Sequence, residues 1–159
     1  MIDGRVWLDD PTVTSTEKPA TTGARRQYVH PTNGVQEYIL VYNGTGGTIA
    51  ANVVVTWSNL AGAGFQVTLP ASANDTKLNI AGVTQVAIPN LNYGWVLRNG
   101  MGQVAFASGA AAAGALARII TTAGTVDDTT ESAAGTQFFC KLVSAHASAG
   151  VKTVIVQLS

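Results

Sequence analysis

Few side chains in this sequence have the chemistry of a reactive site, and they are widely separated. His30 and His146 are the two histidines of the chain. A metal site would need both of them, together with carboxylates such as Asp127 and Asp128 brought near by the fold. His30 precedes a proline, which favours a turn, and His146 ends an apolar stretch, where a surface or hydrogen-bonded histidine is expected. The sequence therefore predicts no metal site and no bound cofactor.

Cys140 is the single cysteine, and as a nucleophile it would need a base within hydrogen-bond distance. His146 is the candidate base, six positions further along the chain. Six residues of a strand span about 20 Å, at roughly 3.3 Å per residue, so the two side chains cannot meet without a bend. A buried thiol that acts as a small apolar side chain is the expected state of Cys140.

Two other segments imitate known binding loops. Residues 44–48 are rich in glycine and threonine, but they lack the lysine and the following helix of a phosphate-binding loop. Asp127, Asp128 and Glu131 lack the ligand spacing and the glycine of a calcium loop. The chain also has no paired carboxylates or helix-borne clusters for acid–base chemistry. We therefore interpret the protein as a non-enzyme.

The composition favours a single domain that meets other proteins. The chain has 159 residues, of which 47% are hydrophobic and only 11% charged, against roughly 25% charged in a typical soluble domain. The charged residues are concentrated in the first 30 positions and form no basic stripe, so no nucleic-acid partner is expected. The start of the chain lacks the pattern of a signal peptide, and no apolar run approaches the roughly 18 residues of a membrane helix. We expect synthesis in a reducing cytoplasm and no membrane partner.

Short β-rich stretches separated by Gly and Asn predict an all-β fold, a single small β-barrel or sandwich spanning residues 31–159. The expected strands are 37–42, 51–57, 64–69, 77–83, two around Trp95 and Val104, 116–121, 136–146 and 151–158. Asn43–Gly47 predicts a hairpin between the first two strands, and Asn99-Gly100 predicts another between the Trp95 and Val104 strands. No repeat with a period of roughly 20–50 residues is visible.

Three further expectations concern particular segments. Gly82 is expected at a bulge or barrel corner. Residues 109–118 are expected to form a loop or a single helical turn, because glycines interrupt an alanine-rich run that is too short for a stable helix. The last strand, 151–158, is expected at the centre of a sheet, with much of both its faces buried.

Residues 1–30 are polar, contain Pro11 and Pro19, and have no helical period. They predict an extended N-terminal arm or a frayed terminus. Trp7 favours the arm, because burying an aromatic side chain is worth roughly 1.5–3 kcal/mol. In this interpretation Trp7 anchors the arm on a neighbouring subunit.

The central part of the chain carries a family resemblance. The stretch Tyr93–Gly100 is followed by the Ala/Gly run Gly109–Gly114, and apolar segments flank both, at Val83–Ile88 and Leu116–Ile120. This order resembles the small capsid decoration (cement) proteins of tailed bacteriophages. The resemblance implies a β-tulip or jelly-roll-like domain on the capsid exterior of the virion, commonly a homotrimer at local three-fold axes. It implies the major capsid protein and the chain itself as partners, and no catalytic residues.

The residues expected to contact the capsid or a neighbouring subunit are Arg5, Trp7 and Leu8 in the arm, with Arg25 and Arg26 facing acidic capsid loops. Repetition by symmetry would add many modest contacts into stable adhesion.

Two alternatives remain open. The first is a tail or head-fibre β domain that recognises a host surface, and copy number in the virion would separate it from a decoration protein. The second is a carbohydrate-binding β-sandwich in which Trp57, Trp95 and Tyr93 form a platform for sugar stacking. The apolar surroundings of Trp95 favour core packing over the platform.

Overall fold

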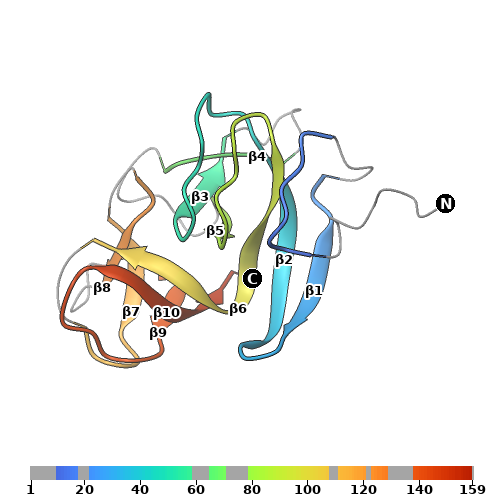
Figure 1. The fold of residues 1–159 in the computed structure, drawn as a ribbon. Coiled ribbons are helices and arrows are strands. Elements are labelled where there is room, and N and C mark those ends of the chain that lie inside the picture. The colour runs from blue at the N-terminus through green and yellow to red at the C-terminus, as the bar shows by residue number, and fades with distance from the viewer. Residues whose placement is uncertain are drawn as a thin grey trace.

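The computed structural model describes residues 10–17, 22–58, 65–70, 79–107, 111–120, 123–128 and 138–158. In chain order its strands are β1 (Arg25–His30), β2 (Gly34–Asn43), β3 (Val54–Trp57), β4 (Gln66–Thr68), β5 (Ile80–Thr84), β6 (Tyr93–Phe106), β7 (Leu116–Ile119), β8 (Val126–Asp128), β9 (Cys140–Leu142) and β10 (Gly150–Gln157). These ranges contain no α-helix, and thus no helix able to span a membrane. The prediction of a small all-β barrel or sandwich is confirmed (Figure 1).

The sheet closes on itself twice. The first ring consists of β2, β4, β3, β5 and β6, and it closes because β2 pairs with β4 on one side and with β6 on the other. All five strands contribute side chains to one packed cluster, which fills this ring: Ile39, Val41, Ile49, Val53, Val55, Val67, Ala81, Ile88 and Val96.

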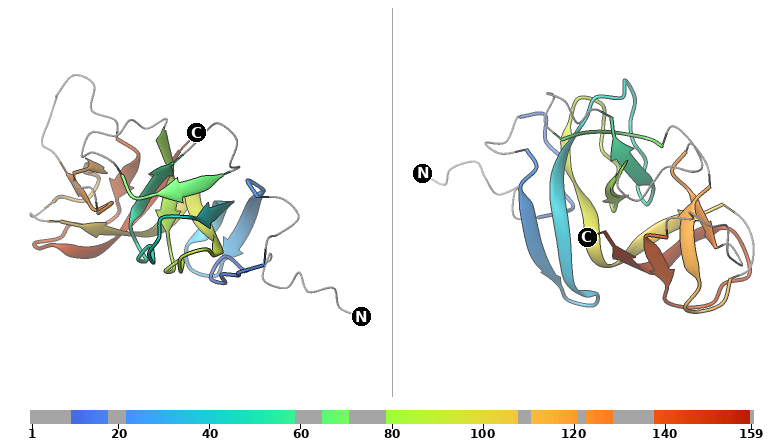
Figure 2. Two further views of the ribbon diagram at one scale, coloured as in Figure 1. Left: turned by 90° about the horizontal axis from the view of Figure 1, so that it is seen from above. Right: turned by 180° about the vertical axis from the view of Figure 1, so that it is seen from behind.

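The second ring consists of β6, β10, β9, β7 and β8. It closes where Phe106 of β6 pairs with Val126 of β8, and the Ala107 N–H donates a 2.9 Å hydrogen bond to the Val126 oxygen. A larger cluster fills this ring and continues into the seam between the rings, where Leu97 and Val54 of the first ring join it. Figure 2 shows the two groups of strands side by side, with β6 passing from one to the other.

The shared strand corrects one prediction. Asn99-Gly100 does not form a hairpin turn, because β6 runs without interruption for 14 residues. Gly100 has a φ of 109°, a backbone conformation that residues other than glycine rarely adopt. Here it bends the strand instead of reversing it. Asn99, at the bend, pairs with Glu37 of β2 and with Gln157 of β10. The second half of β6 thus leaves β2 and continues alongside β10 (Figure 1).

The second ring repeats the topology of the first. In each ring the first strand pairs in parallel with the third (β2 with β4, β6 with β8), and every other pairing is antiparallel. The strand shared by both rings is the last of the first ring and the first of the second. The pairings β3–β4, β3–β5 and β5–β6 correspond to β7–β8, β7–β9 and β9–β10.

The correspondence extends to isolated contacts in the loops. The bridge between Ile49 and Ile88 in the first ring has its counterpart in the bridge between Ala111 and His146 in the second. Similarly, the Asn52 N–H donates to the Thr84 oxygen at 2.7 Å, and the Gly114 N–H donates to the Leu142 oxygen at 2.8 Å. Both Asn52 and Gly114 have positive φ angles, 63° and 85°. The backbone therefore carries a repeat that side-chain patterns in the sequence do not reveal.

The predictions for the Asn43 hairpin and for Gly82 have different outcomes. The turn after Asn43 forms, and the buried Asn43 side chain donates to the Gly47 oxygen at 2.9 Å. The strand after it is not the hairpin partner of β2, however, because β3 pairs with β4 and β5. A register shift in the β3–β5 pairing, beside Gly82, confirms the irregularity predicted there.

β10 lies between β6 and β9, as predicted, but only one of its faces is buried. Val154 and Val156 are inside the second ring, whereas Ile155 between them is 45% exposed. Burial on both faces, which was expected from the apolar run, is therefore wrong. The reason is that the outer face of the second ring has no layer of described residues over it.

The ends of the predicted elements also shift. Residues 25–30, assigned from sequence to the arm, form β1 and pair along their whole length with β2. The strand expected at 136–146 is confined, within the described residues, to Cys140–Leu142. Residues 111–115 form a turn before β7, as the loop prediction required.

Candidate interaction surface

The hairpin of β1 and β2 presents the two most exposed large hydrophobic side chains among the described residues. Val29 and Val35 are paired across the two strands and are 72% and 60% exposed. Gln27 and Arg25 follow on the same face, because alternate residues of a strand point the same way. This face, defined by Arg25, Gln27, Val29 and Val35 and called the hairpin face below, combines apolar and cationic contacts.

The tip of the hairpin is fixed by His30. Its Nδ1 accepts hydrogen bonds from the backbone N–H groups of Thr32 and Asn33, each at 3.1 Å. The turn predicted for His30 is therefore present, and the imidazole acts within it as a local acceptor. The fixed turn holds Val29 and Val35 in place although both are open to solvent.

Arg25 belongs to a small charged group at the edge of the first ring. Its guanidinium lies 3.5 Å from Glu37, and the two side chains are 61% and 25% exposed. The other Glu37 oxygen accepts from the Asn99 Nδ2 at 3.3 Å. Arg98 lies buried nearby, donating to the Ala81 oxygen at 3.1 Å, and burial, with a smaller contribution from the Arg25 charge, lowers its pKa.

Arg25 and Arg26 do not form one cationic patch. They are neighbours in β1 and oppose Ile39 and Tyr38 of β2, so their side chains leave the strand on opposite sides. Only Arg25 shares the hairpin face with Val29.

The three predicted contact residues of the arm, Arg5, Trp7 and Leu8, lie outside the residues that the structure describes. The chain that follows them is attached to the first ring. The Asp10 carboxylate accepts from the Thr12 N–H at 2.8 Å and from its hydroxyl at 2.6 Å, which lowers the pKa of Asp10.

Ser15 and Tyr93 then bind each other through two backbone hydrogen bonds, at 3.0 and 2.7 Å. The described segment 10–17 of the predicted arm is therefore attached beside the first residue of β6.

The aromatic residues proposed for sugar stacking do not form a common platform. Trp95 is 1% exposed and belongs to the core that joins the rings. Trp57 packs edge-on against Phe65, with ring centroids 5.8 Å apart, whereas Tyr93 packs against Tyr42 at 4.9 Å. The preference for core packing of Trp95 is confirmed.

Cys140 and His146 are likewise separate. Cys140 is buried, with its sulfur 4.0 Å from the Ala117 oxygen, and burial raises the pKa of its thiol to about 12. His146 packs its ring edge against Phe106 at a centroid distance of 4.9 Å. Across the described ranges, no three His, Cys, Asp or Glu residues lie close enough together to hold a metal ion.

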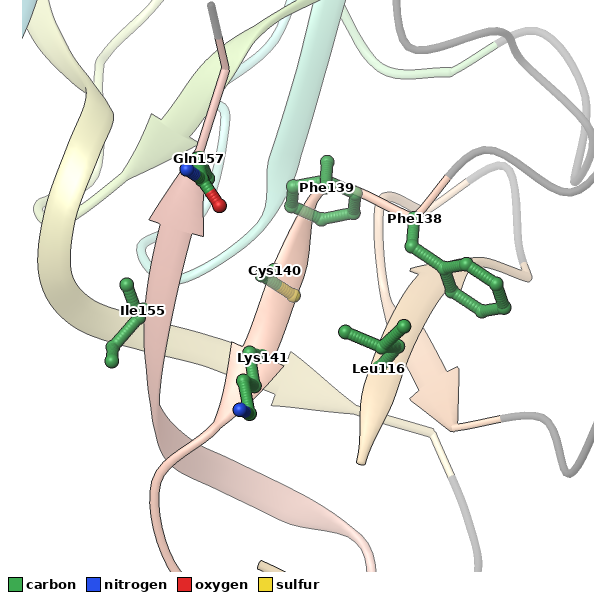
Figure 3. Close-up of a pocket in the computed structure, with 7 residues that line it drawn as sticks. All are labelled: Leu116, Phe138, Phe139, Cys140, Lys141, Ile155 and Gln157. Atoms are coloured by element: carbon green, nitrogen blue, oxygen red, sulfur yellow. The ribbon is translucent and has the colours of Figure 1, made fainter. Parts of the chain in front are cut away.

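A hollow of about 260 Å³ opens on the outer face of the second ring. Leu116 and Phe138 lie beside each other at one side of it, and Lys141 and Ile155 stand on the neighbouring strands (Figure 3). Sequence reasoning missed this site because it placed both faces of the last strand in the core. The sequence carries no signal for it at Ile155, because Val154-Ile155-Val156 is continuously apolar.

Comparisons with known proteins bear on the fold. The sequence matches no protein family and no curated protein. The fold, in contrast, has a match among solved structures. It is similar to the crystal structure of the head fibre gp8.5 N base in bacteriophage phi29. The TM-score is 0.53 at 14% identity, over 77% of this chain and 94% of that one. The likeness at this identity is one of fold.

Proposed function

We propose that this protein is a structural component of a phage virion that binds the outer surface of an icosahedral capsid and stabilises it. The observation that carries the proposal is the fold, which is shared with the base of a phage head fibre over nearly the whole of that base. The low fraction of charged residues supports the proposal, because such a composition suits a protein whose surface is largely covered by other proteins.

In this proposal the hairpin face contacts the major capsid protein. Val29 and Val35 offer apolar area, and Arg25 at their side is positioned to meet a carboxylate of the partner. Arg5, Trp7 and Leu8 would extend this contact from the attached segment at Asp10. Three copies at a local three-fold axis would multiply modest contacts without any single strong one.

A head-fibre base is the second candidate, favoured by the same structural likeness. In that case the two rings would seat a fibre on the capsid, and the distal part would meet the host. Both candidates predict capsid attachment and differ in copy number.

Quantitative mass spectrometry of purified virions tests the proposal by giving copies per major capsid subunit. A ratio within a few-fold of one supports decoration, and a ratio lower by one to two orders of magnitude supports a fibre base. Absence from the virion contradicts both candidates. Co-sedimentation of the recombinant protein with empty capsids that lack it then tests attachment directly.

A further inference from the structure

The two rings carry equivalent rows of residues on their outer faces. Paired across the strands, the first row is Val54, Val83 and Leu97, and the second row is Leu116, Lys141 and Ile155. Each residue of the first row is 0% exposed, whereas Leu116 and Ile155 are 46% and 45% exposed. The same face of the repeated fold is thus covered in the first ring and open in the second.

The cover of the first row is the second ring itself. The Val54 N–H donates to the Gly124 oxygen at 2.8 Å, and the Ala105 N–H donates to the Asn52 oxygen at 2.7 Å. Gly124 lies so close to Val54 that no side chain fits between them. The loop between β7 and β8 therefore seals one end of the first row.

The equivalent of Gly124 in the first ring is Phe65. The Ser58 N–H donates to the Gln66 oxygen, and the Ile120 N–H donates to the Thr125 oxygen, both at 3.1 Å. Phe65 and Gly124 precede these two acceptors and have similar positive φ angles, 63° and 76°. The loop that covers the first row thus has a counterpart that carries an aromatic ring.

The aromatic side chain of Phe65 is open to solvent. Phe65 rests on Gly23, packs edge-on against Trp57, and remains 42% exposed. In the internal seam, a glycine meets a closed surface at Val54. At the second row, a hollow of about 260 Å³ opens beside Leu116 and Phe138. The Phe65 loop thus carries a side chain where the Gly124 loop has none, and the second row has open space where the first row has none.

We propose that the second row is the docking site for the first ring of another copy of this chain, with Phe65 seated beside Leu116. The contact continues between molecules the packing that joins the rings within one molecule. It is head-to-tail, because each copy offers its Phe65 loop to one neighbour and its second row to another. Such contacts either close into cyclic oligomers or extend as filaments. The intermolecular contact can match the internal seam at Leu116 but not towards Ile155. Within one molecule the continuous strand β6 joins the two rings there, whereas between molecules β10 and the neighbour's β2 are not connected.

The proposal concerns self-association and does not depend on capsid binding. Its test is the mass of the purified protein, by light scattering during gel filtration over a range of concentrations. The wild type is expected to form oligomers. Leu116→Asp and Phe65→Asp are each expected to weaken association at least about tenfold, because a charge enters an apolar contact. Leu91→Asp is the matched control: Leu91 is 59% exposed and belongs neither to the hairpin face nor to the two docking surfaces, so the change is expected to leave association unchanged.

Mixing the two variants distinguishes a head-to-tail contact from a two-fold one. Each variant retains one intact surface, so the mixture is expected to form heterodimers that neither variant forms alone. A wild type that stays monomeric at the highest concentration, or variants that associate as well as the wild type, would overturn the proposal. So would a mixture that remains monomeric.

A cysteine pair provides a test that is insensitive to weakened folding. Phe65→Cys in one preparation and Leu116→Cys in another should form an intermolecular disulfide on mixing under mild oxidation. Phe65→Cys mixed with Leu91→Cys should not. Cys140 is buried and takes no part. Equal cross-linking of both pairs would contradict the seating of Phe65 beside Leu116.

Discussion

Gly124 lies against Val54 so closely that a Cβ atom on the glycine would overlap the Val54 carbonyl oxygen. Their backbones are also joined by the hydrogen bond from the Val54 N–H to the Gly124 oxygen, at 2.8 Å. Val54 belongs to the first ring, and Gly124 precedes the β8 strand of the second. This contact is therefore a local measure of how tightly the two rings are held together.

Gly124→Ala is expected to destabilise the protein by about 2–4 kcal/mol. The added methyl group meets backbone atoms that cannot turn aside, and the φ of 76° is unfavourable for alanine. Urea unfolding followed by tryptophan fluorescence gives the free energy of unfolding. Gly46→Ala is the matched control, because its φ is 87° but nothing lies within 4 Å of its Cβ position. Its cost should be only about 1 kcal/mol, and equal costs would contradict the tight seam.

Alkaline pH is expected to weaken the fold through Cys140. Burial raises the pKa of its thiol from 9.0 to about 12. The folded state therefore keeps the proton more tightly than the unfolded chain. The stabilisation is fully present below pH 9 and falls by up to about 1.4 kcal/mol per pH unit as the pH rises from 9 towards 12.

The measurement is urea unfolding of the wild type and of Cys140→Ala at about pH 8 and about pH 10. The variant should lose less stability between the two conditions. Tyr38, whose pKa is raised by burial to about 12, remains in both proteins and contributes equally. Identical pH profiles would show that Cys140 ionises as readily in the folded protein as in the unfolded chain.

Trp95→Ala is expected to cost about 3–5 kcal/mol, because the indole is 1% exposed in the core between the rings. Trp57→Ala should cost less, since its ring is only partly covered, by Phe65. Thermal unfolding monitored by circular dichroism compares the two. A larger loss for Trp57→Ala would contradict the placement of Trp95 at the centre of the core.

Arg25→Gln is expected to change the free energy of unfolding by less than about 1 kcal/mol, because the pair with Glu37 is largely solvated. If the hairpin face meets the capsid, the same change should lower the amount of protein that co-sediments with empty capsids. The charge-conserving Arg25→Lys should retain more binding. Unchanged co-sedimentation of Arg25→Gln would remove Arg25 from the contact.

Trp7→Ala tests the arm separately. It is expected to weaken capsid binding and to leave the melting temperature of the isolated protein unchanged. Both quantities are measured on the same preparation. Normal capsid binding would exclude Trp7 as an anchor, and a lowered melting temperature would assign it to the fold of its own chain.

Sequence patterns were sufficient for the fold class because strand alternation and turn residues are local properties. They failed at Asn99-Gly100, where a local signal has two meanings. A glycine with positive φ can reverse a chain or bend it, and the choice depends on which partner strand lies beyond. β10, the strand that decides the matter, is distant in the sequence.

The hairpin face was predictable only in part. Arg25 was named from its charge as a contact residue, which stays a prediction, and the pairing of Val29 with Val35 on one exposed face required the register of β1 and β2. The second row was invisible for a related reason. Leu116 and Ile155 have the composition of core residues, and only their place outside a closed ring shows that they are exposed.

The continuity of β6 has a mechanical consequence. Two domains joined by a flexible linker separate when their non-covalent seam yields. Here a tension applied across the rings acts along the peptide bonds of one strand, and the hydrogen bonds to β2 and β10 on its two halves are loaded in shear. The rings cannot be pulled apart without disrupting β6, which belongs to both. If the protein binds a capsid, as proposed above, a shell that swells or is strained would therefore stretch this molecule as a single body.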